Sequence, residues 1–256
     1  MKQKEGVEAT PIARLSIRAT IVSLVALITA TAGLGWLGYQ WRNTVPLDVI
    51  AISGNTHVAS TTLHERVGIT GDTLMFRIRP EDVIERVQQD PWVASAMVTR
   101  RPTGTLAVRV VERQPVAIVL RRGEPTVYLD RYGVPMAVTR GVPVDVPVLH
   151  WPSTGAALEA GSAIEDPRLL EMLNVLADLE SATFDLISEL NLDASGLYVF
   201  TTPLPARRSV RVSMGSEGYR EKLERLAHFW SRVVIAHPGD DIREIDLRYD
   251  GQIITS

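Results

Sequence analysis

The chain has 256 residues, of which 45% are hydrophobic and 22% are charged, and its formal net charge is −3. These values are typical of a folded globular protein and exclude wholesale disorder, collagen and a coiled coil. Because the sequence has no cysteine, it also excludes disulfide bonds, cysteine-ligated zinc, iron–sulfur clusters and a thiol nucleophile. The near-neutral balance gives no reason to expect nucleic-acid binding.

Charge is distributed unevenly along the chain. Most of the acidic excess lies after Pro46, whereas the first 45 residues carry five basic side chains and only two acidic ones: Lys2, Lys4, Arg14, Arg18 and Arg42 against Glu5 and Glu8. The basic residues of this leading segment lie on both sides of the most apolar stretch of the sequence.

Residues 19–41 contain no charged side chain. As a helix rising about 1.5 Å per residue they would span roughly 35 Å, enough to cross a hydrocarbon core of about 30 Å. The aromatic residues Trp36, Tyr39 and Trp41 stand at the far end, where such rings prefer the membrane interface. Because basic residues precede the span, we predict a cytoplasmic tail over residues 1–18, a transmembrane helix over 19–41 and the bulk of the chain outside the cytoplasm.

A cleavable signal peptide is the competing interpretation, since Ala30-Thr31-Ala32 has the small-residue pattern of a cleavage site. The apolar stretch continues through Leu37 and ends in the aromatic cluster, which a cleaved peptide would not need. The retained anchor is therefore favoured.

The segment after the anchor alternates strand and helix patterns in a short order. Apolar alternation, helix-capping residues and turn signals predict strand–helix–helix–strand–strand: Asp48–Ser53, a helix capped by Ser60 or Thr61 and ended by Gly68, a helix opened by Pro80, Val93–Arg100 and Thr105–Val119. This order predicts a small α+β module with three strands and two helices on one face.

From about Arg121 the pattern changes to many short strands with two helices. We predict helices from Asp166 to Leu179 and from Gly218 to Val234, the second capped by Ser216. A proline-rich run, Pro143–Pro152, is expected along a sheet edge, because proline cannot donate to a strand ladder. The strand candidates are 126–129, 134–138, 187–192, 197–202, 209–213, 242–249 and 252–255.

No catalytic constellation is apparent in the sequence. The five histidines do not form a zinc-binding HExxH pattern, and the chain has no phosphate-binding loop and no dinucleotide-binding glycine fingerprint. Gly215-Ser216-Glu217-Gly218 has the wrong spacing for a nucleophile elbow. We therefore predict a binding protein rather than an enzyme, with no cofactor, no metal and no small-molecule substrate.

Two stretches are candidate interaction surfaces. Residues 77–122 hold nine arginines against five acidic residues, which suits anionic lipid headgroups or an acidic partner, although solvated strand and helix faces produce the same counts. The C-terminal stretch IREIDLRYDGQIITS from Ile242 ends without a covering element. A last strand at a sheet edge offers unpaired backbone groups to a partner strand, but it is equally an ordinary edge protected by its charges.

A set of motifs runs in order along nearly the whole chain. It comprises the anchor with its basic tail and five further stretches: DVIAISGNTHVASTTLHERVGI from Asp48, GDTLMFRIRPEDVIERVQQDPWVASAMVTRRPTGTLAVRVVERQPVAIV from Gly71, YLDRYGVPM from Tyr128, EGYREKLERLAHFW from Glu217 and IDLRY from Ile245. As an ordered set these motifs resemble the FtsQ/DivIB family of bacterial cell-division proteins.

The resemblance implies an α+β fold: a single transmembrane helix, a POTRA module (β-α-α-β-β) over 45–119, and a larger, mostly antiparallel β domain with two flanking helices over 120–256. It further implies a non-enzymatic, single-pass inner-membrane scaffold of the division septum, with a cytoplasmic N-terminus and a periplasmic bulk. Its implied partners are division membrane proteins: an FtsB/FtsL-like pair and FtsK-, FtsW- and FtsI-like proteins.

Residue by residue, the resemblance places the partner-docking edge on the terminal strand: Ile245, Leu247, Arg248, Tyr249, Gln252, Ile253 and Ile254. Arg248 is expected to pair with a partner carboxylate and Tyr249 to act as an anchor. Recruitment by other division proteins is expected at the loop before the second helix: Leu74, Phe76, Arg77 and Arg79. The alternative is a POTRA-bearing accessory of outer-membrane assembly or secretion, and a periplasmic hydrolase released by signal cleavage comes third.

Overall fold

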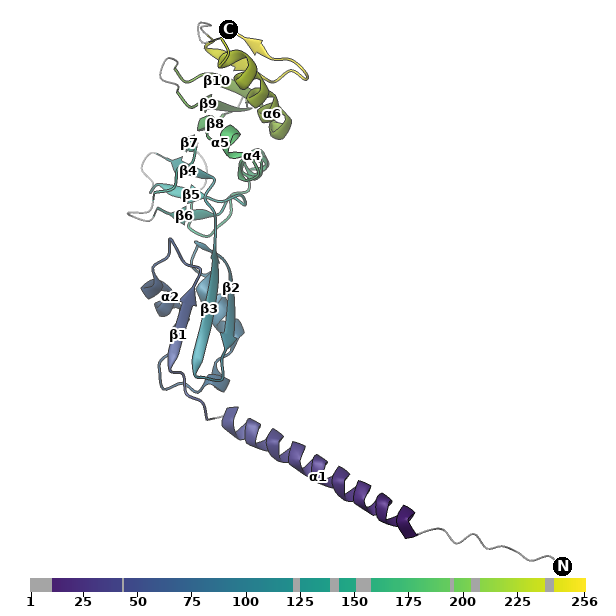
Figure 1. Cartoon of the computed structure of the whole chain (residues 1–256). Coiled ribbons are helices and arrows are strands. Elements are labelled where there is room, and N and C mark those ends of the chain that lie inside the picture. Colours follow the sequence, from purple (N-terminus) through teal and green to yellow (C-terminus); the bar gives the residue numbers. More distant parts are fainter. Residues whose placement is uncertain are drawn as a thin grey trace, which may run out of the picture.

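The computed structural model describes residues 11–42, 44–121, 125–138, 143–150, 158–193, 196–203, 208–237 and 242–256. Three parts follow one another along an elongated molecule (Figure 1): a long helix, a three-stranded α+β module and a larger sheet domain. The predicted α+β fold class is thereby confirmed. Lys2, Lys4, Pro152 and the acidic pair Asp240-Asp241 lie outside the described residues.

Helix α1 (Pro11–Arg42) contains one candidate membrane span, Ala19–Gln40, with a mean hydropathy of 1.9 and no buried residues. Its polar side chains are compatible with lipid, because helical hydroxyls bond to carbonyls one turn back: Thr29 Oγ1 donates to the Val25 carbonyl at 3.0 Å and Thr31 Oγ1 to the Leu27 carbonyl at 2.9 Å. The helix begins at Pro11, inside the segment predicted as a cytoplasmic tail.

The first module has the predicted strand–helix–helix–strand–strand order. Its sheet runs β1-β3-β2, with β1 parallel and β2 antiparallel to the central β3. Helices α2 and α3 pack on one face, and their apolar side chains Leu63, Val67, Val83 and Val87 are fully buried. The elements are β1 (Val49–Ser53), α2 (Ser60–Val67), the 3-10 helix η1 (Met75–Arg77), α3 (Pro80–Gln88), β2 (Val93–Arg100) and β3 (Thr105–Glu112).

For α2 the predicted C-terminal end is confirmed and the predicted N-terminal cap is wrong. Gly68 ends α2 in the left-handed conformation (φ 59°), as expected of a glycine there. At the other end the prediction is wrong: the cap position is Ala59, and no side chain caps the helix. Pro80 opens α3 at its first turn, as predicted.

The predicted strand Thr105–Val119 is two strands in two sheets. β3 ends at Glu112, where the Arg113 amide donates to the Trp92 carbonyl at 2.7 Å. The following Pro115 has no N–H to continue a ladder, and the chain re-enters sheet structure as β4 (Ala117–Leu120) in the larger domain. One apolar run therefore joins the two domains.

The larger domain is a nine-stranded, mostly antiparallel sheet of order β12-β11-β10-β9-β8-β7-β4-β5-β6. Its core is formed between the sheet and its helices, with Leu173, Tyr219 and Leu226 fully buried. The elements are β5 (Val127–Leu129), β6 (Pro135–Ala137), β7 (Val148–His150), α4 (Pro167–Ala177), α5 (Ser181–Phe184), β8 (Ile187–Asp193), β9 (Gly196–Thr201), β10 (Arg211–Gly215), α6 (Tyr219–Phe229) with a π turn at Trp230–Val234, β11 (Glu244–Asp246) and β12 (Ile254–Thr255).

The proline-rich run was wrongly expected at a sheet edge. Its strand β7 lies in the sheet interior, parallel to both β4 and β8. The described prolines precede the strand, and Pro147 contributes only its carbonyl, which accepts from the Ile118 amide at 2.9 Å. Their missing N–H groups therefore do not interrupt the ladder.

The predicted cap of α6 is also wrong. Ser216 does not cap the helix; the cap position is Gly218, at φ 69°. The amides of Gly218 and Tyr219 donate instead to Glu171 Oε1 of α4, at 3.1 and 3.3 Å. A carboxylate from a neighbouring helix thus replaces the local hydroxyl, and it ties α4 to α6.

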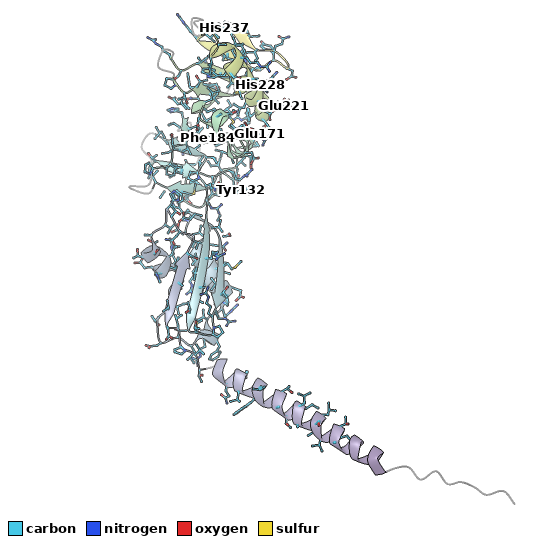
Figure 2. The ribbon with its side chains drawn as sticks, viewed as in Figure 1. Tyr132, Glu171, Phe184, Glu221, His228 and His237 are labelled. Carbon is cyan, nitrogen blue, oxygen red and sulfur yellow. The ribbon has the colours of Figure 1, made fainter. Side chains whose placement is uncertain are left out.

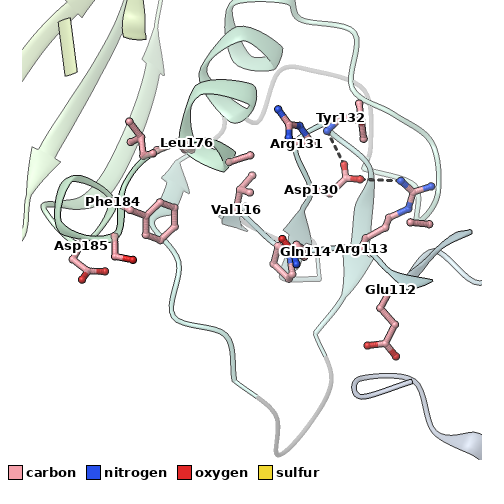
Figure 3. Close-up of a pocket in the computed structure, with 15 residues that line it drawn as sticks. Glu112, Arg113, Gln114, Val116, Asp130, Arg131, Tyr132, Leu176, Phe184 and Asp185 are labelled. Carbon is pink, nitrogen blue, oxygen red and sulfur yellow. Dashed lines mark hydrogen bonds and ion pairs between the residues drawn. The ribbon is translucent and has the colours of Figure 1, made fainter. Parts of the chain in front are cut away.

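The two domains share packing at their junction. Tyr128 and Met136, from β5 and β6 of the larger sheet, are buried in the apolar core of the first module. Trp92 Nε1 donates to the Ala137 carbonyl at 2.8 Å, and the Arg113 guanidinium pairs with Asp130 at 2.8 Å. Figure 3 shows this pair beside an open cavity of about 370 Å³ bounded by Tyr132, Leu176 and Phe184.

Candidate docking site

The C-terminal end of the larger sheet carries the backbone groups that a partner strand would need. β12 is the terminal strand, paired only with β11 in the part of the chain that the structure describes. Glu244 and Ser256 exchange both of their backbone hydrogen bonds, at 3.2 and 3.1 Å. In an antiparallel ladder the next residue, Thr255, therefore points its N–H and C=O toward the unpaired side.

The predicted docking residues divide into an exposed and a buried group. The side chain of Tyr249 is 53% exposed and that of Ile254 is 47% exposed, and Gln252 is exposed as well. Ile245 and Leu247 are fully buried in the core, and Ile253 packs against it. Side-chain contact with a partner is thus open to Tyr249, Gln252 and Ile254, whereas the buried residues hold the edge in place.

Arg248 is committed within the chain. Its guanidinium binds the Asp246 carboxylate through Nη2 at 2.6 Å and Nε at 3.0 Å. This hydrogen bonding lowers the pKa of Asp246 below its ordinary value. A partner carboxylate would therefore have to share the Arg248 guanidinium with Asp246 or displace Asp246 from it.

Two basic side chains of α6, not among the predicted docking residues, bind backbone carbonyls close to the C-terminal edge. The buried amine of Lys222 donates to the carbonyls of Met214 and Glu217, at 2.7 and 2.6 Å. Arg225 Nη2 and Nη1 lie 3.5 Å from the carbonyls of Leu247 and Tyr249. The sequence gives no signal for these contacts, because they depend on where β10 ends and on the path of the chain after β11.

An aromatic patch lies on one face of the large sheet, close to the C-terminal edge. Tyr198 and Phe200 of β9 meet edge to face, with ring centroids 6.1 Å apart. The guanidinium of Arg211 lies 4.5 Å above the Tyr198 ring and 3.9 Å from Glu244 of β11. The β9–β10–β11 register therefore places an aromatic and charged surface next to the terminal edge.

The predicted recruitment residues lie at the opposite end of the molecule. Leu74 is half-buried beside Pro46, while Phe76 is 40% exposed on η1. Arg77 stacks near the Phe76 ring at 5.8 Å, and the exposed Arg79 makes a loose pair with Asp82 at 3.6 Å. These residues do not adjoin the C-terminal edge, so the chain carries two separate candidate surfaces.

The helical side of the larger domain offers a different surface. Figure 2 labels Tyr132, Phe184, Glu171, Glu221 and His228 along the side on which α4, α5 and α6 lie. Tyr132 is 62% exposed and has the Arg131 guanidinium 5.9 Å from its ring. No group of three His, Asp or Glu side chains that could hold a metal ion occurs within the described residues.

Two family models match consecutive parts of the chain. The model described as "POTRA domain, FtsQ-type" matches residues 45–113. The model described as "Cell division protein FtsQ/DivIB, C-terminal" matches residues 117–248. The second match covers more than half of the chain and includes the segment from β11 through Arg248.

Curated relatives match over most of their own length. The cell division protein FtsQ of Rhodothermus marinus is 33% identical over 250 residues, covering 96% of this chain and 90% of that protein. That of Salinibacter ruber is 32% identical over 233 residues, covering 90% and 89%. A solved structure of the major extracytoplasmic domain of DivIB from Geobacillus stearothermophilus is 19% identical and has a TM-score of 0.31, covering 50% of this chain and 98% of that one.

Proposed function

The chain belongs to the FtsQ/DivIB family of cell division proteins, and we propose that it is a non-enzymatic scaffold that docks other division proteins on its C-terminal edge. The family, together with the single candidate transmembrane helix among the described residues, indicates a single-pass membrane protein of cell division. Docking of an FtsB/FtsL-like pair on β12 is the specific function proposed here. The family membership supports this function over the alternative in outer-membrane assembly.

The unpaired side of β12 is the observation that carries this proposal. Thr255 presents both backbone groups there, and the exposed Tyr249 and Ile254 flank it. An extended partner segment that adds to this edge would gain main-chain hydrogen bonds from the strand and specificity from the neighbouring side chains. A tyrosine beside such an edge supplies the large, rigid contact area common at interface hot spots.

The proposed topology follows from the charge pattern. Basic residues before the candidate span Ala19–Gln40 favour a cytoplasmic N-terminus, which would place both sheet domains on the periplasmic side of the inner membrane. The residues Leu74, Phe76, Arg77 and Arg79 remain the proposed recruitment surface for FtsK-, FtsW- or FtsI-like proteins at the septum. Their position next to the membrane-proximal end supports contact with other membrane proteins.

The test compares two exposed tyrosines of the same sheet domain. Tyr249→Ala should reduce capture of the FtsB/FtsL-like pair at least about tenfold, as loss of a hot-spot side chain does. Tyr132→Ala, at the other end of the domain, is the matched control and should leave capture unchanged. A fluorescent fusion of Tyr249→Ala should still gather at midcell, whereas one lacking residues 45–119 should not.

Unchanged capture by Tyr249→Ala, with full-length protein in the membrane fraction, would contradict the docking site. Truncation after Asp240 serves as the stronger variant, because it removes β11 and β12 together. Midcell gathering without residues 45–119 would contradict the recruitment surface while leaving the docking site untouched.

A further inference from the structure

A cavity of about 480 Å³ lies between the end of α1 and the first module. Figure 1 shows the C-terminal end of α1 beside this module. Four segments line it: Gly38 of α1, Val45 of the following connection, Met75 and Phe76 of η1, and Arg100, Arg101 and Pro102 at the end of β2 and just beyond it. None of these seven residues is acidic. The cavity therefore combines apolar walls with two guanidinium groups.

The position of Gly38 in the candidate span indicates how deep this cavity lies relative to a bilayer. Gly38 lies two residues before the end of the candidate span, between the exposed rings of Trp36 and Tyr39. Such rings prefer the interface between hydrocarbon and water. The glycine therefore lies at the level of the lipid headgroups.

The module side of the cavity is held at the same level by backbone hydrogen bonds. The Met75 amide donates to the Val45 carbonyl at 3.0 Å, and the Leu47 amide donates to the Thr73 carbonyl at 2.9 Å. Val45 is only three residues beyond the end of α1. These bonds keep η1 close to the membrane-proximal end of the anchor.

The two arginines have donors to spare. Arg100 Nη1 donates to the carbonyls of Phe76 and Ile78, at 3.4 and 3.2 Å, which orients the guanidinium and leaves its Nε and Nη2 without partners among the described residues. The Arg101 side chain is exposed and makes no hydrogen bond or ion pair with the described part of the chain. Guanidinium groups bind phosphate through paired N–H donors.

We propose that this cavity binds the headgroup phosphate of an anionic phospholipid from the adjoining leaflet. Arg100 and Arg101 hold the phosphate, and Met75 and Phe76 contact the glycerol and the first acyl carbons. The bound lipid joins the anchor to the sheet module and fixes the orientation of the module relative to the membrane. This function is separate from partner docking at the C-terminal edge. It shares Phe76 with the proposed recruitment surface, whose other residues do not line the cavity.

The experiment uses the full chain in nanodiscs that contain equal amounts of phosphatidylglycerol and phosphatidylcholine. Native mass spectrometry after mild detergent release counts the lipids that stay bound. Wild-type protein should retain one phosphatidylglycerol, and the double variant Arg100→Gln/Arg101→Gln should retain about thirtyfold less, as expected for loss of two membrane-surface cations.

A second variant fills the cavity without changing charge. A Cβ added at Gly38 meets no atom within 4 Å, so Gly38→Leu leaves α1 intact while its side chain occupies the lipid position. It should lose phosphatidylglycerol as the double variant does. Arg109→Gln, an exposed arginine of β3 without a partner among the described residues, is the control and should bind as wild type.

Three outcomes would overturn the proposal. If the double variant and Gly38→Leu both retain as much phosphatidylglycerol as wild type, the cavity is not the binding site. If wild-type protein retains as much phosphatidylcholine as phosphatidylglycerol, the site does not select anionic lipid. Displacement of phosphatidylglycerol from wild-type protein by an excess of inorganic phosphate shows that the arginines bind free phosphate instead of a lipid.

Discussion

Glu112, the last residue of β3, holds the turn after β1 by a single carboxylate. Its oxygens accept the amides of Thr56, His57 and Val58 at 2.9–3.0 Å and contact the His57 ring at 2.9 Å. Burial opposes ionisation, but these hydrogen bonds outweigh it and lower the pKa of Glu112 below its ordinary value of 4.5. The turn is thus stabilised by an ionised group that carries three backbone donors.

The lowered pKa predicts an acid-dependent loss of stability. A carboxyl group whose pKa is lower in the folded state stabilises the fold above its unfolded value, and this contribution is lost as pH falls through the folded value. Glu112→Gln should cost about 1–3 kcal/mol at pH 7, because the neutral amide loses the negative charge that the three backbone donors face and puts an NH₂ group where Oε2 accepts from the His57 amide. The difference in free energy of unfolding between wild type and variant should shrink below pH 4.5.

Chemical denaturation of the full chain in detergent, from pH 7 to pH 3, measures this difference. Glu189→Gln is the control, because Glu189 pairs with His150 on the surface, with both side chains 45% exposed; it should change stability little. A difference that stays constant over the whole pH range would show that ionisation of Glu112 does not hold the turn.

At the scale of single elements, the hydrophobic pattern predicted the longer helices and most strands, while two of the errors arose from contacts distant in sequence. Ser216 resembles a helix cap locally, but the amides of α6 are bound by Glu171, 47 residues earlier. Likewise, the proline-rich run resembles an edge strand, yet β4 and β8 enclose β7. Periodicity identifies an element but does not specify its neighbours.

The candidate docking site shows the same division. Its residues are found from the IDLRY motif, but alternation alone does not distinguish the buried Leu247 from the exposed Tyr249, because the chain leaves regular strand structure after Asp246. The role of Arg225 is not predictable either, since its contacts are to backbone carbonyls of the segment after β11. Sheet order and register decide both.

The edge strand β12 leads to a prediction that separates backbone from side-chain docking. Thr255→Pro removes an outward-facing N–H and keeps the ladder to β11, because the bonds of Ser256 lie on the other side. Proline also favours the extended conformation that Ile254 already has. Capture of the proposed partner should fall at least about fivefold, the effect of losing one interfacial hydrogen bond.

Binding measured by titration in detergent tests this prediction. Ser256→Pro, which removes the donor to the Glu244 carbonyl, should instead detach β12 and weaken binding further. Full affinity in Thr255→Pro would mean that a partner reaches this end of the molecule without pairing to the strand.

At the scale of the whole molecule, we expect the shared packing at the junction to hold the two sheet domains as one rigid body. Trp92 contacts the larger domain twice: its ring meets Tyr128 edge to face at 5.9 Å, and its Nε1 donates to the Ala137 carbonyl. Within the first module the same ring stacks on His57, with centroids 4.5 Å apart. A rigid junction would keep the proposed docking edge at a fixed distance from the membrane-proximal end.

Because the chain has no cysteine, two spin labels can be placed cleanly on exposed residues of the two domains, by Met97→Cys and Ile235→Cys. Pulsed electron paramagnetic resonance should give one narrow distance distribution for otherwise wild-type protein. Trp92→Phe removes the hydrogen bond to Ala137 but keeps an aromatic ring, so the distribution should broaden while the fold persists. Phe200→Ala, away from the junction, should leave it narrow, and a broad distribution before any change at Trp92 would show that the domains move independently.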